Sequence, residues 1–173
     1  MKIEIEASLI GSILDIGGGG EAVIGQIYGH RVIAIDNMQE ELDEAPNCCQ
    51  KQLMDAVNMS FADQSFDNVT FFYSLMYMTE ETQQKAINEA ARVLKKDGIA
   101  CIWDSDIQSA YPDPFSVDLD ICSGQIAVHT SYGIVKDESQ DSVTILRFLK
   151  QANLSVESLQ EANGHFYIQC RKI

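Results

Sequence analysis

The stretch that most restricts the fold is SILDIGGGGEAVIGQIYGHRVIAID, residues 12–36, in which four consecutive glycines separate two short apolar runs. The first run, Ile13 to Ile16, carries Asp15 and ends at the glycines, and the second, Val32 to Ile35, ends at Asp36. Apolar residues at helical spacing lie between the two runs. This order predicts a strand, a glycine turn, a helix and a second strand, with an acid accompanying each strand.

The glycines and the two acids together predict a nucleoside pocket. Four consecutive glycines lose much conformational entropy on folding, so a folded chain keeps them where the backbone needs a positive φ or where a ligand comes close. At the exit of a parallel strand, such a ligand usually rests against the N-terminus of the following helix. Asp36 follows Asp15 by 21 residues, a suitable distance for a second-strand carboxylate to accept hydrogen bonds from ribose hydroxyls.

The charges beside the glycines distinguish between two kinds of nucleoside. Gly17, Gly19 and Ala22 fit the dinucleotide pattern G-x-G-x-x-G/A, so the glycine spacing alone does not decide. Asp15 and Glu21 flank the glycines and would repel a pyrophosphate in a poorly screened pocket. S-adenosylmethionine has no phosphate and carries a sulfonium and an ammonium, so the same carboxylates would attract it. The sequence therefore favours S-adenosylmethionine as the cofactor.

The motifs that follow one another from Ile13 to Asp104 resemble those of class I S-adenosylmethionine-dependent methyltransferases. D-x-G-x-G at residues 15–19 is similar to the first family motif, and Met-Asp-Ala at residues 54–56 to the third-strand motif. Residues 61–78 and 89–104 resemble the segments around strands four and five. The resemblance implies a cofactor site made of Asp15, Gly17, Gly18, Gly19, Asp36, Asn37, Met38, Asp55, Ala56 and Phe72.

The resemblance also implies what some of these residues do. Asp36 would hold the ribose hydroxyls, and Asn37 and Met38 would pass the adenine. Asp55 would meet the exocyclic amine of the adenine, and the backbone amide of Ala56 would meet the ring. One departure is that Glu21 stands where the family has its third glycine. Either the helix packs further from the strand, or Glu21 points outward at the helix N-terminus, where a negative charge is favourable.

The implied fold is α/β, a three-layer α/β/α doubly wound sheet of seven mostly parallel strands with an antiparallel last strand. Residues 1–173 are predicted to form a single domain, since a chain of this length buries enough surface for one core. Two final strands, Leu154 to Leu159 and His165 to Cys170, are joined by a turn at Asn163 and Gly164. A dinucleotide-binding domain lacks this final hairpin.

Alternating apolar residues predict a further β-hairpin, inserted after strand five within residues 106–140. This hairpin is either a lid over the cofactor or a surface through which two copies form a homodimer. Residues 1–11 alternate weakly and predict either an extra edge strand or a disordered lead.

Two helices are also predicted. Thr79 is expected to cap a helix that ends near Lys95 and Lys96, and Val143, Leu146 and Leu149 are expected on the apolar face of another helix.

Composition limits the partners. A net charge of −14 disfavours nucleic acid, whose binding depends on cations, and suits a neutral or cationic small-molecule acceptor. The sequence has no run of 18 apolar residues and no signal-peptide pattern at its start, so we expect a cytoplasmic protein that does not enter a membrane. The five cysteines and three histidines lack metal-ligand spacing, so no metal site is predicted.

The predicted reaction is methyl transfer from S-adenosylmethionine to an unidentified acceptor, which we expect to be a small molecule. The methyl group is already activated, so the protein mainly aligns the acceptor and excludes water. No catalytic base is evident; Asp104, Tyr77 and His129 are candidates. The NPPY-type motif of enzymes that methylate base amines or glutamine is absent. A non-catalytic subunit that binds the cofactor or a partner is the alternative, and aminopropyl transfer lacks a polyamine signature.

Overall fold

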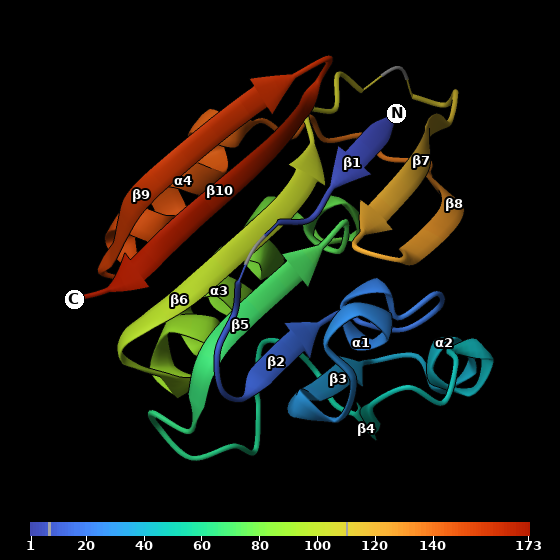
Figure 1. Ribbon diagram of the computed structural model, residues 1–173. Coiled ribbons are helices and arrows are strands. Elements are labelled where there is room, and N and C mark those ends of the chain that lie inside the picture. Colours follow the sequence, from blue (N-terminus) through green and yellow to red (C-terminus); the bar gives the residue numbers. More distant parts are fainter. Residues whose placement is uncertain (7, 110) are drawn as a thin grey trace.

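The computed structural model describes residues 1–6, 8–109 and 111–173 and is built on a seven-stranded sheet (Figure 1). The strand order is β4-β3-β2-β5-β6-β10-β9. In chain order the strands are β2 (Ile13–Ile16), β3 (Val32–Asp36), β4 (Gln50–Leu53), β5 (Phe66–Phe72), β6 (Leu94–Ser105), β9 (Leu154–Ala162) and β10 (His165–Lys172). The pairs among the first five strands are parallel, whereas β10 runs antiparallel to both β6 and β9. The predicted seven-stranded sheet with its antiparallel last strand is confirmed.

The two faces of the sheet are covered differently. The long helices α3 (Glu80–Val93) and α4 (Ser142–Gln151) pack on one face through a core that includes Ile87 and Phe148. On the other face, α1 (Val23–Tyr28) shares a second core with a small sheet of order β1-β7-β8. The remaining helices are α2 (Gln39–Glu44), η1 (Gly29–Arg31) and η2 (Leu75–Tyr77). The second layer is thus part helix and part sheet.

The small sheet consists of the N-terminal strand and a hairpin. Its strands are β1 (Lys2–Glu4), β7 (Phe115–Ser123) and β8 (Ile126–Ile134), and the hairpin lies between β6 and α4 in the chain. β1 pairs in parallel with β7, so residues near the start of the chain form an edge strand. Ala7, in that predicted segment, and Ala110, in the predicted insertion, lie outside the described residues.

Two local predictions were wrong. α3 ends at Val93, so Lys95 and Lys96 lie in β6 rather than in the last helical turn. The chain leaves the helix there because Leu94 already pairs with Phe66 of β5. In α4, Val143 is 70% exposed, so it does not lie on the buried face that was predicted to contain it.

Of the other residues predicted for the apolar face of α4, Leu149 is buried and Leu146 packs against the core from a partly buried position. The buried face also contains Ile145 and Phe148, which were not predicted. The Thr79 hydroxyl caps α3 by accepting a hydrogen bond from the amide of Thr82, as predicted. Asn163 and Gly164 both have positive φ in the turn between β9 and β10.

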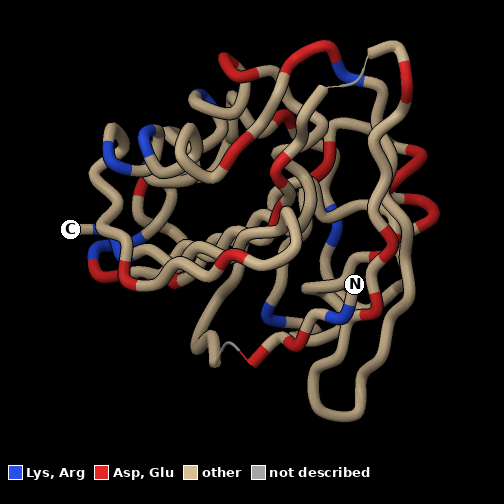
Figure 2. Tube along the Cα trace, turned by 90° about the horizontal axis from the view of Figure 1, so that it is seen from above, with Lys and Arg blue, Asp and Glu red and all other residues tan. Residues whose placement is uncertain are grey.

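Charge is distributed unevenly over the fold. Figure 2 shows Asp and Glu over much of the chain; several Lys and Arg residues lie near the C-terminal end, and others lie near the N-terminus and elsewhere. Several of these cations bond to nearby backbone or acids; for example, the Lys172 amine donates to the carbonyl of Leu94 and Lys95 pairs with Asp67. None of the described helices is both long and apolar enough to span a membrane.

Candidate functional site

A cavity of about 610 Å³ lies at the carboxyl ends of the parallel strands. Its wall is formed by the glycine turn between β2 and α1, the ends of β3 and β5, the segment after β4, and residues of β8. The structure brings all of the residues predicted to bind the cofactor to this one cavity. They are Asp15, Gly17, Gly18, Gly19, Asp36, Asn37, Met38, Asp55, Ala56 and Phe72.

The neighbouring strand and helix hold the glycine turn in place. The amides of Gly17 and Gly18 both donate to the carbonyl of Ile35, at 2.8 and 3.0 Å, and the amide of Gly20 donates to the carbonyl of Glu41 at 2.9 Å. Gly17 and Gly20 have φ values of 72° and 58°, which L side chains rarely adopt. The turn is therefore defined by the protein's own hydrogen bonds.

The other two glycines let acidic side chains approach the backbone. A Cβ on Gly18 would lie 2.4 Å from Oδ2 of Asp15, and a Cβ on Gly19 would lie 2.6 Å from Cβ of Glu41 and 2.9 Å from Oδ2 of Asp36. Such distances are far below van der Waals contact. The absence of side chains here lets the carboxylates of Asp15 and Asp36 lie directly against the turn.

Asp15 is the most deeply buried acid of the site. Its carboxylate accepts a hydrogen bond of 2.6 Å from the hydroxyl of Thr70 on β5. Burial raises the pKa of Asp15 to about 7, the Thr70 hydrogen bond opposes this rise, and the nearby Asp36 adds to it. Near neutral pH this carboxyl therefore exists in both protonation states.

The two other predicted acids are oriented by backbone amides. Oδ1 of Asp36 accepts from the amide of Met38 at 2.9 Å, and Oδ2 accepts from the amide of Gly19 at 3.3 Å. Oδ1 of Asp55 accepts from the amide of Val57 at 3.0 Å. A carboxylate oxygen has more than one acceptor position, so these groups keep capacity to bind ligand hydroxyl or amine groups.

The cavity is strongly acidic. Its described lining contains no Lys or Arg and includes five carboxylates, those of Asp15, Glu21, Asp36, Glu41 and Asp55. Burial, then the neighbouring Asp36, raises the pKa of Glu41. A pyrophosphate would meet repulsion from this lining, whereas a cation would be attracted. Glu21 comes directly before Ala22, the N-cap residue of α1, and lines the cavity rather than pointing away from it.

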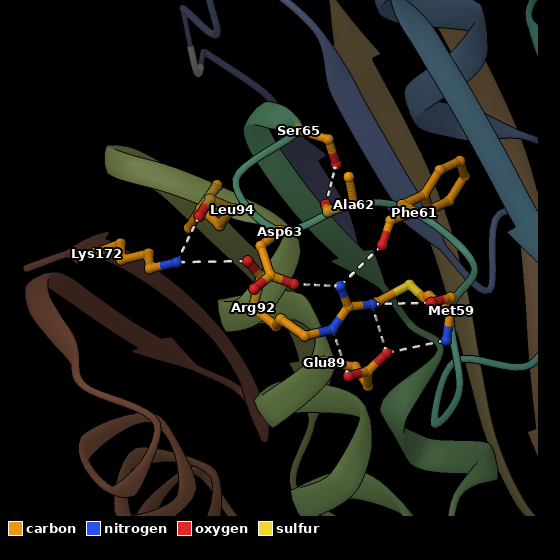
Figure 3. Close-up of polar contacts among 9 residues, drawn as sticks. All are labelled: Met59, Phe61, Ala62, Asp63, Ser65, Glu89, Arg92, Leu94 and Lys172. Atoms are coloured by element: carbon orange, nitrogen blue, oxygen red, sulfur yellow. Dashed lines mark hydrogen bonds and ion pairs between the residues drawn. The ribbon is translucent and has the colours of Figure 1, made fainter.

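The segment that carries Asp55 and Ala56 is fastened to α3 by Arg92 (Figure 3). The Arg92 guanidinium donates to the carbonyls of Met59 and Phe61, each at 2.8 Å, and to the carboxylates of Glu89 and Asp63. Glu89 in turn accepts from the amide of Met59 at 2.9 Å. Paired carboxylates raise the pKa of Arg92 above its ordinary value. This cluster fixes the irregular chain between β4 and β5.

Several lining residues were not expected from the sequence. Glu41 lies on α2, and Tyr73 and Ser74 follow β5 directly. Tyr132 and Gly133 come from β8 of the hairpin, and the ring of Tyr132 stacks on Tyr73 with centroids 5.6 Å apart. Only the lid interpretation of the hairpin anticipated a contribution from β8, and no motif distinguished Tyr132 from other residues of the strand.

The three candidate bases have different positions. Tyr77 lines the cavity and is 50% exposed. His129 lies on the exposed side of the hairpin, paired with Asp120 at 2.9 Å, and is not part of the cavity lining. The third candidate, Asp104, also lies outside the lining.

Asp104 is instead part of a buried hydrogen-bond network. Its carboxylate accepts from the amides of Met76 and Ser105 and from the side-chain amide of Gln140. The Gln140 side chain also accepts from Gln83 of α3. Burial raises the pKa of Asp104 to about 6, against these hydrogen bonds. The network joins β6, η2 and α3 behind the site.

Comparison with known proteins gives a family match and a fold match. The family model described as "Methyltransferase domain" matches residues 14–102, which is more than half of the chain. A comparison with curated protein sequences gave no match. Among solved structures, the PH0226 protein of Pyrococcus horikoshii OT3 has a TM-score of 0.70 and 17% identity, covering 94% of this chain and 83% of that one.

Two further solved structures carry a functional name. A SAM-dependent methyltransferase from Methanosarcina mazei has a TM-score of 0.67 at 16% identity, covering 96% of this chain and 94% of that one. The glycopeptide N-methyltransferase MtfA, complexed with S-adenosyl-L-homocysteine, has a TM-score of 0.65 at 11% identity, covering 96% and 85%. At these identities the likeness establishes a shared fold.

Proposed function

The chain belongs to the methyltransferase domain family, and we propose that it transfers a methyl group from S-adenosylmethionine to a small-molecule acceptor. The observation that carries this proposal is the acidic cavity at the carboxyl ends of the strands, lined by the glycine turn and five carboxylates. The family match and the fold neighbours named as SAM-dependent methyltransferases support the same cofactor.

The residues of the cavity fit S-adenosylmethionine. Asp36, at the end of β3, has acceptor capacity for the two ribose hydroxyls, and Asp55 and Ala56 would bind the adenine edge. Asp15 and Glu21 place negative charge beside the turn, where the ammonium and sulfonium would be favoured. When bound, the cofactor supplies a methyl group on a positively charged sulfur.

The protein's own contribution would be alignment and exclusion of water. Tyr132 and Gly133 of the hairpin and Tyr77 of η2 line the cavity from outside the sheet. Tyr132 packs on Tyr73, so the hairpin is positioned to cover a bound cofactor. We infer that the hairpin acts as a lid. The net charge of −14 favours a neutral or cationic acceptor over nucleic acid.

The proposal is tested by titrating the protein with S-adenosylhomocysteine and, separately, with NAD in a calorimeter. S-adenosylhomocysteine is expected to bind and NAD is not. Asp36→Ala should weaken S-adenosylhomocysteine binding by at least about tenfold, roughly 1.4 kcal/mol, since it removes the ribose acceptor. Asp43→Ala changes an exposed acid on α2 that bonds to Gln39, and it serves as the matched control.

Two results would contradict the proposal. Preference for NAD would indicate a dinucleotide site instead, and equal binding by the Asp36→Ala and Asp43→Ala variants would remove the ribose assignment. Incubation with radiolabelled S-adenosylmethionine and a pool of small-molecule acceptors then tests turnover. Binding without transfer to any acceptor would favour the non-catalytic subunit.

A further inference from the structure

A second cavity, of about 400 Å³, lies on the sheet face that α3 and α4 leave uncovered. Residues 1–6 form one side of it, and residues of β6, β9 and β10 form the other. We refer to it as the Trp103 groove, after the ring in its wall. Figure 1 shows the N-terminal segment passing in front of β6, with β9 and β10 beside it.

Tyr73 belongs to both cavities. It lines the acidic cavity and the Trp103 groove, and its backbone φ of 49° places it in the left-handed region that few bulky side chains adopt. Its ring stacks on Tyr132 of the acidic cavity, and its hydroxyl lies 2.8 Å from Nδ1 of His165, in the groove. Tyr73 therefore borders both the proposed cofactor site and the groove.

His165 offers a hydrogen-bonding atom to the groove. Its Nδ1 is held by the hydroxyls of Tyr73, at 2.8 Å, and Ser105, at 3.0 Å, while Nε2 contacts no partner among the described residues. An unpartnered Nε2 is also not one of the buried unpaired polar atoms of the described residues, so it is open to solvent. Burial lowers the pKa of His165, which keeps the ring neutral at physiological pH.

The tautomer of this neutral ring decides whether Nε2 donates or accepts. If Nδ1 accepts from the two hydroxyls, Nε2 carries the hydrogen; if Nδ1 carries it, Nε2 accepts. A ligand hydroxyl can pair with either form, because it is both a donor and an acceptor. The imidazole therefore suits a ligand that bears a hydroxyl group.

The aromatic part of the wall suits a planar ring, and Lys2, Glu4 and Glu6 of the N-terminal segment add charged groups to the lining. Trp103 stacks on Tyr167 with centroids 4.8 Å apart and planes inclined by 29°, and it also lies 5.9 Å from Phe72. Flat aromatic surfaces bind aromatic ligands by offset stacking or edge contacts. The side chains of Gln160 and Gln169 add polar groups at the outer part of the groove.

We propose that the Trp103 groove binds an aromatic compound carrying a hydroxyl group, and that this compound is the methyl acceptor. The second half of the proposal rests on the proposed function. His165 would hydrogen-bond the hydroxyl, and Trp103 and Tyr167 would contact the ring. In this proposal the ring of Tyr73, which borders both cavities, turns aside so that the hydroxyl reaches the methyl group.

Methyl transfer to the hydroxyl needs only the cofactor, the hydroxyl compound and His165. The carbon–sulfur bond breaks as the carbon–oxygen bond forms, and the positively charged sulfonium becomes a neutral thioether. The hydroxyl proton passes to Nε2 of His165 in the tautomer whose hydrogen is on Nδ1, and from there to water. No oxidant or reductant is required.

The first test is binding, read from Trp103, the only tryptophan of the chain. Its fluorescence is titrated with p-cresol and catechol, and with toluene and cyclohexanol as probes that lack the hydroxyl or the aromatic ring. The two phenols should quench or shift the emission saturably, and each control compound should bind at least about fivefold more weakly. Equal responses to all four compounds would overturn the proposal.

A matched pair of variants tests the role of the imidazole. His165→Gln should weaken p-cresol binding by about fivefold or more, whereas His129→Gln, on the exposed side of the hairpin, should leave it unchanged. Thermal unfolding checks that both variants fold. If His165→Gln unfolds, the comparison of phenols with toluene and cyclohexanol in the wild-type protein still decides the matter.

The two proposals can fail separately. If S-adenosylhomocysteine binds but no phenol affects Trp103, the groove proposal is wrong and the proposed function stands. If phenols bind but S-adenosylhomocysteine does not, the proposed function fails, and the acceptor role with it. If both bind, transfer of the methyl group to p-cresol or catechol by the wild-type protein would support the acceptor role, and no transfer to either phenol would contradict it.

Discussion

The hydroxyl of Thr70 donates to the carboxylate of Asp15 across 2.6 Å, and both side chains are buried between β2 and β5. This one hydrogen bond lowers the pKa of Asp15 by less than burial raises it, and the pKa rises from 3.8 to about 7. The folded protein therefore binds a proton at Asp15 more tightly than the unfolded chain does. Asp15 favours folding most at low pH, and this contribution is lost as the pH rises through 7.

Asp15→Asn should accordingly change the pH dependence of stability. The amide is neutral at every pH and still accepts from Thr70, so the stability of the variant relative to wild type should rise from about pH 4 to pH 7. The shift in pKa corresponds to a change on the order of 4 kcal/mol. Urea unfolding of the ligand-free proteins across this range measures it. Asp104 titrates in both proteins and cancels from the difference; a flat difference would contradict the assignment.

Gly18→Ala should destabilise the protein, because the new Cβ would lie 2.4 Å from the Asp15 carboxylate and 3.0 Å from Cβ of Ala34. A cost of about 1–3 kcal/mol is expected for such overpacking. Gly133→Ala is the control, since its Cβ would approach no atom closer than 3.7 Å. Denaturant midpoints for the two variants give the comparison, and a Gly18→Ala protein as stable as Gly133→Ala would show that the turn can relax.

Asp104→Ala should lower stability by about 2–4 kcal/mol, since the amides of Met76 and Ser105 and the Gln140 side chain would lose a buried acceptor. Asp104→Asn keeps one acceptor oxygen and should cost less. Equilibrium unfolding in urea distinguishes the two. A normal stability together with a large loss of methyl transfer would instead support a catalytic role for Asp104.

Arg92→Lys should destabilise the segment that carries Asp55. Lysine cannot reproduce the planar set of bonds to Glu89 and to the carbonyls of Met59 and Phe61, so a loss of about 2 kcal/mol is expected, with weaker S-adenosylhomocysteine binding. Arg147→Lys, in an exposed pair with Glu80, should change stability by less than about 0.5 kcal/mol. Thermal unfolding and calorimetry check both; similar losses in the two variants would argue against the Arg92 cluster.

Hydrogen exchange should detect the hairpin acting as a lid. Amides of β8 around Tyr132 should exchange more slowly when S-adenosylhomocysteine is present, because a closed lid opens less often. Amides of β9, far from the acidic cavity, provide the internal control.

Light scattering at several protein concentrations tests the separate prediction of a homodimer. Unchanged exchange in β8 with a concentration-dependent mass would favour the dimer surface over the lid.

The sequence predicted the sheet well because its central strands are buried on both faces. Ile13–Ile16 is buried throughout, so its apolar run had the same bounds as the strand. Asp15 and Asp36 were identifiable because they lie beside a glycine turn at strand ends, where a buried or half-buried carboxylate has few structural explanations. Local and periodic features were thus sufficient for the sheet and for bringing the glycine turn and the two acids together at one cavity.

The features that were missed depend on contacts between distant parts of the chain. Tyr132 meets Tyr73 only because the hairpin folds back over the sheet, and Asp104 is removed from the cavity by bonds to Gln140, 36 residues further on. Lys95 was assigned to a helix because its charge suits a helix terminus, but strand pairing at Leu94 outweighs that preference. Propensity and charge pattern do not contain this information.

The carbonyl of Ile35 already accepts from the amides of Gly17 and Gly18, so the backbone that would cradle a cofactor has its shape before any ligand arrives. Ordering that segment costs no further conformational entropy on association, and more of the contact energy remains as affinity. The speed of capture would then depend on diffusion and on how often β8 moves clear of the entrance, rather than on rearrangement of the glycine turn.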